Sequence, residues 1–386
     1  MRPNYDYKGR SQTIIRKIIS DMPPGTISLA RGDPEKPKRD MIEEFYGYIN
    51  EVDNGGYAPT CGSDYSRKVF SKHYKERHDI DIPKENFCIM DGGASRALFS
   101  IFVSYLEDGD TVLLPDVTFL LYEGQIKSIS DMMPEGIKVG YVKTNPDFSL
   151  DEEDLKKKVE KEKPKMFVFA TPNNPTGTRY GEEELKLISD LSNDYEFGIV
   201  SDEVYDELIF DGRKHHSILS YDDNAIQVNS ASKKFMPDLR LGWISSKNGE
   251  RIKELLPKVQ IINPSAPSSV VHAYARSLEN GLIKRYTDDV LPRYKKNVNH
   301  LSDELEDLGF KVQKPDSTFY VFPKLPDNID DMKFSDVLIK NGVAGVPGSA
   351  FGPGGKRHMR FSCGNATIDE LDEAIKRIKK SLKVYK

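Results

Sequence analysis

Short apolar runs alternate with amphipathic segments through the middle of the chain. Each run has the length of a buried strand, whereas the intervening segments place apolar residues at helical spacing, as Leu185, Ile188 and Leu191 do. This alternation predicts a mostly parallel sheet covered by helices on both faces, which is an α/β fold. The predicted strands are Phe87–Met90, Thr111–Leu114, Val139–Val142, Met166–Ala170, Phe197–Val200, Ala225–Val228 and Leu241–Ile244.

The pattern of apolar and polar residues changes after about residue 290. A charged helix is predicted over 295–308, followed by two short strands at 318–322 and 359–362. Thr367 and Glu370 have the spacing of a capping box and precede a stripe of apolar residues, so a final helix begins there. We therefore expect a smaller α+β domain in addition to the sheet.

The N-terminal region is expected to complete that smaller domain. Isoleucines 14, 15, 18 and 19 have helical spacing, and a Pro/Gly-rich passage that reads as irregular chain follows them. The predicted division is a large domain over 45–290 and a small domain made of 1–44 and 291–386.

Composition narrows the functional classes. Lys and Arg number 56 against 61 Asp and Glu, a net charge of −5 that gives no basic patch for nucleic acid. Cys61, Cys88 and Cys363 lie far apart in the sequence, which argues against a zinc site or a disulfide framework. No apolar run approaches the roughly 18 residues of a membrane span and no signal region opens the chain, so we expect a soluble, cytoplasmic protein.

Polar clusters follow the predicted strands, at the sheet edge where ligands of such folds bind. Gly93, Ala94 and Ser95 follow the first strand and open a helix that is expected to begin near Arg96, so their backbone N–H groups could bind an anion. Phe119, expected on the first turn of the next helix, could stack on a ring or equally pack in the core. Taken singly, both features are weak signals.

The next two clusters are more specific. Asn174 lies between two prolines in the sequence TPNNPTG, directly after a strand, where a plain turn would not need both asparagines. Asp202 and Tyr205 follow another strand in the sequence SDEVY. An acid there is costly to bury unless a cation meets it, although a salt-bridged capping Asp is the simpler reading of that element alone.

A lysine with a serine and an arginine nearby completes the set. Lys233 follows Ser230 by three positions and precedes Arg240 by seven, in the sequence NSASKKFMPDLRLGW. Chemistry on a phosphorylated aldehyde needs an amine nucleophile, a hydroxyl donor and a guanidinium fork. Together the clusters match pyridoxal 5'-phosphate, whereas the G-x-G-x-x-G turn of a nicotinamide site is absent.

On these motifs the chain resembles the class I/II aminotransferases, fold-type I enzymes similar to aspartate aminotransferase. The matches also include YAPTCG at 57–62 and MRFS at 359–362. The resemblance implies that Lys233 binds the cofactor covalently and shuttles a proton, that Asp202 pairs with the pyridine nitrogen, and that Tyr205 holds the ring oxygen. The other implied contacts are Asn174 to the ring oxygen; Gly93, Ala94, Ser95, Ser230 and Arg240 to the phosphate; Phe119 to the ring; Tyr57 to the partner subunit's phosphate; and Arg360, Asn174 and Gly32 to the substrate.

Two positions depart from the family pattern. Arginine normally follows the lysine by eight positions, not seven, and Asp238 stands where glycine is usual. Assigning the role to Lys234 would worsen the spacing and make Ala231 the upstream residue. Lys233 is therefore the better candidate, with a shortened loop before Arg240.

The resemblance implies a homodimer and transfer of an amino group from an L-amino acid to a 2-oxo acid, with 2-oxoglutarate the expected acceptor. The same scaffold also hosts C–S β-lyases and decarboxylases, because the pocket selects which bond the cofactor breaks. A non-catalytic ligand sensor is a third alternative. No metal is expected, since the histidines lack ligand spacing and the pair His215-His216 is typical of an exposed turn.

Overall fold

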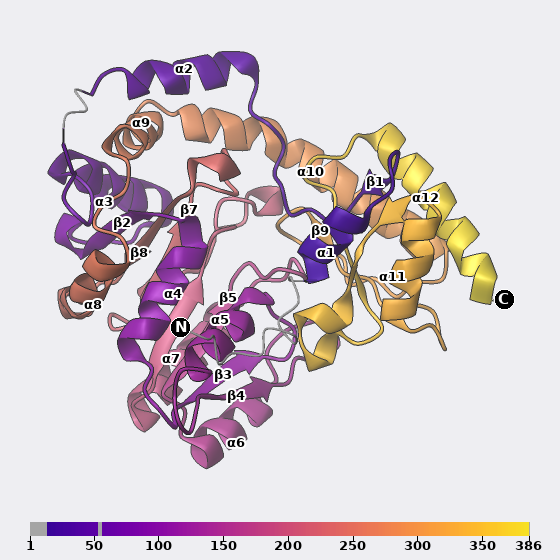
Figure 1. Ribbon diagram of the computed structural model, residues 1–386, viewed down its shortest axis with the longest axis horizontal. Coiled ribbons are helices and arrows are strands. Elements are labelled where there is room, and N and C mark those ends of the chain that lie inside the picture. The colour runs from indigo at the N-terminus through magenta and orange to yellow at the C-terminus, as the bar shows by residue number, and fades with distance from the viewer. Residues whose placement is uncertain (1–13, 53–55, 386) are drawn as a thin grey trace, which may run out of the picture.

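A computed structural model describes residues 14–52 and 56–385. At its centre is a seven-stranded sheet with strand order β2-β8-β7-β6-β5-β3-β4 (Figure 1). The strands are β2 (Phe87–Asp91), β3 (Thr111–Pro115), β4 (Lys138–Val142), β5 (Met166–Ala170), β6 (Gly198–Asp202), β7 (Ile226–Ser230) and β8 (Leu241–Ser245). All seven lie at the predicted places, with β6 and β7 displaced toward the C-terminus by one or two residues.

Six of the strands run in one direction, and β8 runs opposite to both of its neighbours. The carboxyl ends of β2, β5, β6 and β7 therefore lie on the same edge of the sheet. The predicted fold class, an α/β protein with a mostly parallel sheet, is confirmed.

Side chains alternate between the two faces of the sheet because successive residues of a strand point in opposite directions. In β5, Met166, Val168 and Ala170 pack in one apolar cluster, while Phe167 and Phe169 pack in the other. Helices α4, α5 and α8 cover the first face, and α3, α6, α7, α9 and α10 cover the second.

The helices agree with the amphipathic segments, apart from their ends. The observed helices are α1 (Ile14–Asp21), α2 (Arg39–Ile49), α3 (Asp64–His78), α4 (Gly93–Tyr105), α5 (Leu121–Ser130), α6 (Glu152–Glu162), α7 (Glu182–Tyr195), α8 (Gly249–Ile262), α9 (Ser268–Glu279), α10 (Leu282–Asp307), α11 (Asp331–Lys340) and α12 (Ile368–Leu382). Helix α4 begins three residues before the expected position. Thr367 caps α12 through the predicted capping box with Glu370.

The C-terminal elements form a separate group of short strands and helices. Strands β11 (Val346–Pro347), β12 (Met359–Ser362) and β9 (Tyr320–Val321) make a three-stranded antiparallel sheet. The N-terminal segment joins this group, because β1 (Ile27–Ser28) pairs in parallel with β10 (Val343–Ala344), and Figure 1 shows α1 beside the same elements. The proposed division near residue 290 stays a prediction, and α10 runs continuously across that position.

Among the helices in the described part of the chain, none combines the length and the apolar character that crossing a membrane requires.

Candidate active site

A cavity of about 240 Å³ lies at the carboxyl-end edge of the large sheet and extends to the C-terminal elements. Eleven of the residues predicted from the sequence line it, and only Gly93 and Tyr57 do not. The eleven are Gly32, Ala94, Ser95, Phe119, Asn174, Asp202, Tyr205, Ser230, Lys233, Arg240 and Arg360. The clusters that are spread along the sequence therefore meet in one place.

Lys233, not Lys234, reaches into the cavity. Its Nζ donates a hydrogen bond to the Gly32 carbonyl oxygen at 2.6 Å, whereas the Lys234 side chain is buried elsewhere, beside Asp206. A Cβ on Gly32 would lie 2.4 Å from Tyr320 Oη and 3.7 Å from Lys233 Nζ. Glycine at position 32 thus leaves room for the Tyr320 hydroxyl beside the lysine amine.

Asp202 ends β6 and is buried below the cavity. Its Oδ2 accepts a hydrogen bond from Tyr122 Oη at 2.7 Å, whereas its Oδ1 is buried with no hydrogen-bond partner. Burial raises the pKa of Asp202 to about 6, against the lowering effect of the Tyr122 hydrogen bond. An unpaired carboxylate oxygen in a cavity is an acceptor for a ligand donor. Tyr122 was not predicted from the sequence, although it follows Phe119 by only three positions.

Tyr205 lies within hydrogen-bonding distance of a second tyrosine across the cavity. Its Oη is 2.9 Å from Tyr320 Oη, and burial raises the pKa of Tyr205 well above its ordinary range. The Tyr205 phenol therefore stays protonated, and its hydroxyl can donate to a ligand oxygen. Tyr320 was also not predicted from the sequence, because no pattern in its strand indicates contact with the large sheet.

Arg360, on β12, is a buried cation among neutral partners. Its Nη1 donates to Asn174 Oδ1 at 3.0 Å and its Nη2 to the Ala30 carbonyl at 2.6 Å. The rings of Tyr320 and Phe351 lie 4.7 and 5.0 Å from its Cζ. Burial lowers the pKa of Arg360 against the opposing charge of Asp33, and no carboxylate within residues 14–52 and 56–385 lies close enough to form an ion pair with it. Such a buried cation calls for an anionic ligand.

Asn174 and Asn173 follow β5 and have different roles. Asn173 Nδ2 donates to the Val117 carbonyl oxygen at 3.0 Å and to Thr176 Oγ1 at 3.1 Å, which holds the turn together. Asn174 instead turns its amide into the cavity beside Arg360. Only the second asparagine is thus placed to contact a ligand.

An anion site is formed where α4 begins. The first turn of α4 presents the backbone N–H groups of Ala94 and Ser95, and the helix dipole favours negative charge there. The Gly93 N–H instead donates to the Arg240 carbonyl oxygen at 2.9 Å. The guanidinium of Arg240 is held beside this turn, because its Nη2 donates to the Gly92 carbonyl oxygen at 2.6 Å. The shortened loop therefore still delivers Arg240 to the cavity.

The hydroxyl side of the anion site contains one more serine than expected. Ser230 Oγ donates to the Leu241 carbonyl at 2.8 Å and accepts from the backbone N–H of Ser232 at 3.0 Å. Ser232 also lines the cavity and was not predicted. Asp238, which stands where the family has glycine, is exposed to solvent.

Two of the expectations concern aromatic residues. Phe119 lines the cavity but precedes α5, which begins at Leu121, so its expected place on the first helical turn is wrong. The reason is that the segment after β3 stays irregular while Thr118 N–H bonds the Phe351 carbonyl. Tyr57 lies outside the cavity with 92% of its surface exposed, so its contact with a partner subunit stays a prediction.

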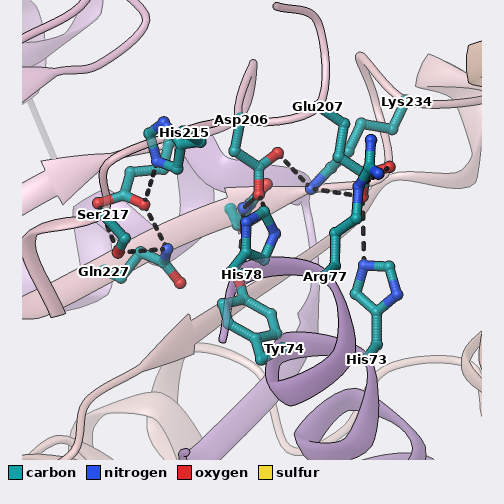
Figure 2. A network of polar contacts seen from close by, with 12 residues as sticks. His73, Tyr74, Arg77, His78, Asp206, Glu207, His215, Ser217, Gln227 and Lys234 are labelled. Carbon is teal, nitrogen blue, oxygen red and sulfur yellow. Dashed lines mark hydrogen bonds and ion pairs between the residues drawn. The ribbon is translucent and has the colours of Figure 1, made fainter. Parts of the chain in front are cut away.

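Three of the histidines, His73, His78 and His215, lie in a second buried polar cluster that includes Lys234 (Figure 2). The expectation of an exposed turn is wrong for His215, whose side chain is 2% exposed and whose Nε2 lies 2.7 Å from Glu203 Oε2. Burial follows because Glu203, itself fully buried, needs partners for its charge. We call His73, His78, His215, Glu203, Asp206, Glu207 and Lys234 the lysine–histidine cluster.

Three members of this cluster could also bind a metal ion. Ligand atoms of His73, His78 and Glu207 lie within 4.8 Å of one another, a grouping that the sequence spacing did not reveal. Two cations already lie at Glu207, because Lys234 Nζ and Arg77 Nε are each 3.9 Å from one of its oxygens. A divalent ion would meet their repulsion, so this grouping is better explained as an ion-pair cluster.

The cavity fits pyridoxal 5'-phosphate. Its amine, Lys233, suits the aldehyde, and the unpaired Asp202 Oδ1 suits a protonated ring nitrogen. The start of α4 and Arg240 suit the phosphate group. Each part of the cofactor thus meets a complementary group of the protein.

Comparisons with known proteins agree with this geometry. Residues 26–378 match the family described as aminotransferase class I and II. The probable aspartate aminotransferase of Methanocaldococcus jannaschii is 29% identical, covering 96% of this chain and 97% of the relative. The aspartate aminotransferase of Pyrococcus horikoshii is 31% identical, covering 92% and 90%.

A solved structure gives the same result. The crystal structure of the aromatic aminotransferase from Pyrococcus horikoshii OT3 matches with a TM-score of 0.85 and 26% identity, covering 96% of this chain and 99% of that one. Because the family match spans most of the chain and the cavity fits the cofactor, this protein belongs to the class I and II aminotransferases, which depend on pyridoxal 5'-phosphate.

Proposed function

We propose that this aminotransferase moves the amino group of an L-amino acid to 2-oxoglutarate in a ping-pong cycle. One observation carries the proposal: a lysine amine, an unpaired buried carboxylate oxygen and a buried guanidinium without an acidic partner line a single cavity. These groups are respectively complementary to an aldehyde, a ring N–H and a substrate carboxylate.

The cofactor, when bound, supplies an aldehyde that takes up the amino group and a ring that withdraws electrons from the substrate. Asp202 would accept a hydrogen bond from the ring nitrogen and so keep it protonated. Asn174 and Tyr205 would hold the ring oxygen, and Phe119 would stack on the ring. Ala94, Ser95, Ser230 and Arg240 would hold the phosphate, and Gly93, whose N–H donates to the Arg240 carbonyl oxygen, would keep Arg240 beside it.

The remaining residues act on the substrate. Arg360 would pair with its α-carboxylate through a planar fork, which orients the Cα–H bond toward the lysine. Lys233 Nζ would then remove the Cα proton and return it to the cofactor carbon, as general base and general acid in turn. Gly32 and Asn174 would border the carboxylate on either side.

We further propose a cytoplasmic homodimer in which Tyr57 reaches the phosphate bound by the partner subunit. The exposure of this tyrosine supports the proposal, because a large aromatic side chain that is 92% exposed is available for an interface. A two-fold axis would place each Tyr57 at the other subunit's site.

The proposed function is tested with the purified, cofactor-loaded protein. Single amino acids (aspartate, glutamate, an aromatic one, alanine and a basic one) are added while the visible absorption is recorded. We expect one of them to bleach the visible band in stoichiometric amount and 2-oxoglutarate to restore it. Chromatography of the products would then show the matching oxo acid and glutamate.

Other outcomes would redirect the assignment. Release of ammonia and pyruvate, or of carbon dioxide, without bleaching would replace transamination by lyase or decarboxylase chemistry. A protein that binds amino acids but alters none of them would act as a ligand sensor.

A further inference from the structure

Two loops carry most of the proposed catalytic groups, and the backbone does not hold them together. The ladder between β6 and β7 ends at the pair Asp202 and Val228. Asp202 is the last residue of β6, Tyr205 lies in the loop after β6, and Lys233 lies in the loop after β7. Beyond the ladder, the distance between these loops depends on side chains.

The Lys234 side chain makes this connection. Its Nζ lies 2.8 Å from Asp206 Oδ1 and 5.0 Å from the centroid of the Trp243 ring, and the side chain is 2% exposed. Lys234 directly follows Lys233, and Asp206 directly follows Tyr205. One buried ion pair therefore joins the two loops at the positions next to the proposed catalytic groups.

Asp206 is itself fixed from two further directions. Asn229 Nδ2, at the end of β7, donates to its Oδ2 at 2.9 Å, and His78 Nε2, on α3, lies 3.2 Å from the same oxygen (Figure 2). Burial opposes ionisation, but the charge of Lys234 and the contact with His78 hold the pKa of Asp206 well below its ordinary range. The Asp206 carboxyl of this pair is therefore ionised throughout the neutral pH range.

Glu207 secures the other side of the lysine. Its Oε1 lies 3.9 Å from Lys234 Nζ and 3.2 Å from His73 Nε2 on α3. Against the effect of burial, the hydrogen bond from His73 and the charge of Lys234 lower the pKa of Glu207 to about 2. Lys234 therefore faces two carboxylates and cannot move away without leaving a buried negative charge unpaired.

We propose that Lys234 is a positioning residue that holds Lys233 in register with Asp202 and Tyr205. The inference rests on the proposed roles of those three residues. Reactions between bound groups tolerate little displacement, since about 1 Å of misplacement can cost roughly a hundredfold in rate. A rigid buried pair between adjacent loops supplies such precision, as surface pairs do not.

The test compares Lys234→Met with Lys234→Arg in the cofactor-loaded protein. Methionine keeps the volume but removes the charge, so the loops lose their connection, whereas arginine can restore the ion pair. For Lys234→Met we expect kcat to fall roughly ten- to a hundredfold with KM changed less. The pH midpoint of the visible absorption change should also move, and Lys234→Arg should recover part of both effects.

A matched control is Lys186→Met, which removes an exposed lysine paired with Glu182. It should leave kcat and the absorption midpoint as in the unchanged protein. A lower melting temperature in Lys234→Met, with unchanged kcat and midpoint, would overturn the proposal and leave only a structural role. If Lys234→Met does not fold, Asp206→Asn tests the same pair, and an unchanged midpoint there would overturn it too.

The outcome is separate from that of the proposed function. Normal turnover in Lys233→Ala would refute the catalytic assignment, whatever the Lys234 variants do. If Lys233→Ala is inactive while Lys234→Met has unchanged kcat and midpoint, only the positioning role fails.

Discussion

The two buried polar clusters differ in how completely their charges are paired. In the active-site cavity, Asp202 Oδ1 and Arg360 Nε have no hydrogen-bond partner, and Arg360 meets only neutral acceptors. In the lysine–histidine cluster, Lys234 meets two carboxylates and each of these meets a histidine. Because unpaired buried charge is costly, the first cluster leaves groups available to a ligand, whereas the second pairs its charges within the protein.

Two neighbouring residues show the contrast at its smallest scale. Asp202 and Glu203 are consecutive and nearly fully buried, yet one keeps a free oxygen and the other does not. The partners of Glu203 are Ser201, His215, Ser217, Gln227 and the Ile218 N–H. Side chains at adjacent positions of a strand end point to opposite faces, so one acid faces the cavity with a free oxygen and the next is fully paired within the protein.

The largest effect is expected for Lys233→Ala. Removing both the amine nucleophile and the proton carrier should lower turnover by about 10⁴-fold or more. Steady-state turnover measures the loss, and thermal unfolding of the same variant should show little change because Lys233 makes a single hydrogen bond. Turnover near that of the unchanged protein would remove Lys233 from the chemistry.

Asp202→Asn should reduce turnover by about 10²- to 10³-fold, because a neutral amide cannot keep the ring nitrogen protonated. In the unchanged protein, cofactor binding should strengthen as the pH rises through about 6, where Asp202 ionises. Stability of the cofactor-free protein should show the opposite trend. The raised pKa contributes stability below the ordinary Asp range, and that contribution is lost as the pH rises through about 6.

Cofactor titrations and unfolding experiments at pH 5 and pH 7 would measure both trends for Asp202. The asparagine variant should show neither. A pH dependence that persists in Asp202→Asn must come from another group.

Arg360→Met should lower kcat/KM by about 10²- to 10³-fold, because the substrate carboxylate would lose its buried charged partner. The cofactor-free variant should be as stable as the unchanged protein or more so, since an apolar side chain replaces an incompletely paired buried cation. Kinetics and chemical denaturation of one preparation give both values. A clear loss of stability would show that Arg360 belongs with the paired cluster.

Glu203→Ala should have the opposite effects to Arg360→Met, lowering stability and leaving turnover nearly unchanged. It leaves His215, Gln227 and three further donors unsatisfied, so we expect a destabilisation of about 3 kcal/mol. Turnover per folded, cofactor-loaded molecule should change little. Urea denaturation measures the stability, and Glu182→Ala, at an exposed position, is the control that should unfold at the same urea concentration as the unchanged protein.

The smallest effect is expected for Tyr122→Phe, which removes one hydrogen bond to Asp202. The cost should be about 1 kcal/mol, roughly fivefold in cofactor affinity at neutral pH. Because that hydrogen bond lowers the pKa of Asp202, the pH dependence of cofactor binding should move to higher pH. An unchanged dependence would mean that the tyrosine does not act on the carboxylate.

Local patterns were sufficient for most of the fold. Apolar runs with strand length predicted all seven strands of the large sheet, and the Thr367 capping box predicted the start of α12. Such signals depend on neighbours in the sequence. Element ends were less accurate, as at α4, because glycine at 92 and 93 reads as a turn although the helix already begins there.

The candidate site was predicted where a motif surrounded each residue, as for Asn174, Asp202 and Lys233. Tyr320 escaped because its contact with Tyr205 joins residues 115 positions apart. His215 was misread because its contact with Glu203, which follows β6 and lies 12 positions earlier in the chain, is formed only in the fold.

By itself, the sequence determined the class of fold, the order of the strand-end clusters and the chemical groups available for the cofactor. These properties follow from residue type and short-range spacing. Only the tertiary structure decided which lysine enters the cavity, which acid keeps a free oxygen, and that the loop before Arg240 still reaches the anion site. The physical reason is that pairing and burial of charge depend on side chains brought together from distant parts of the chain.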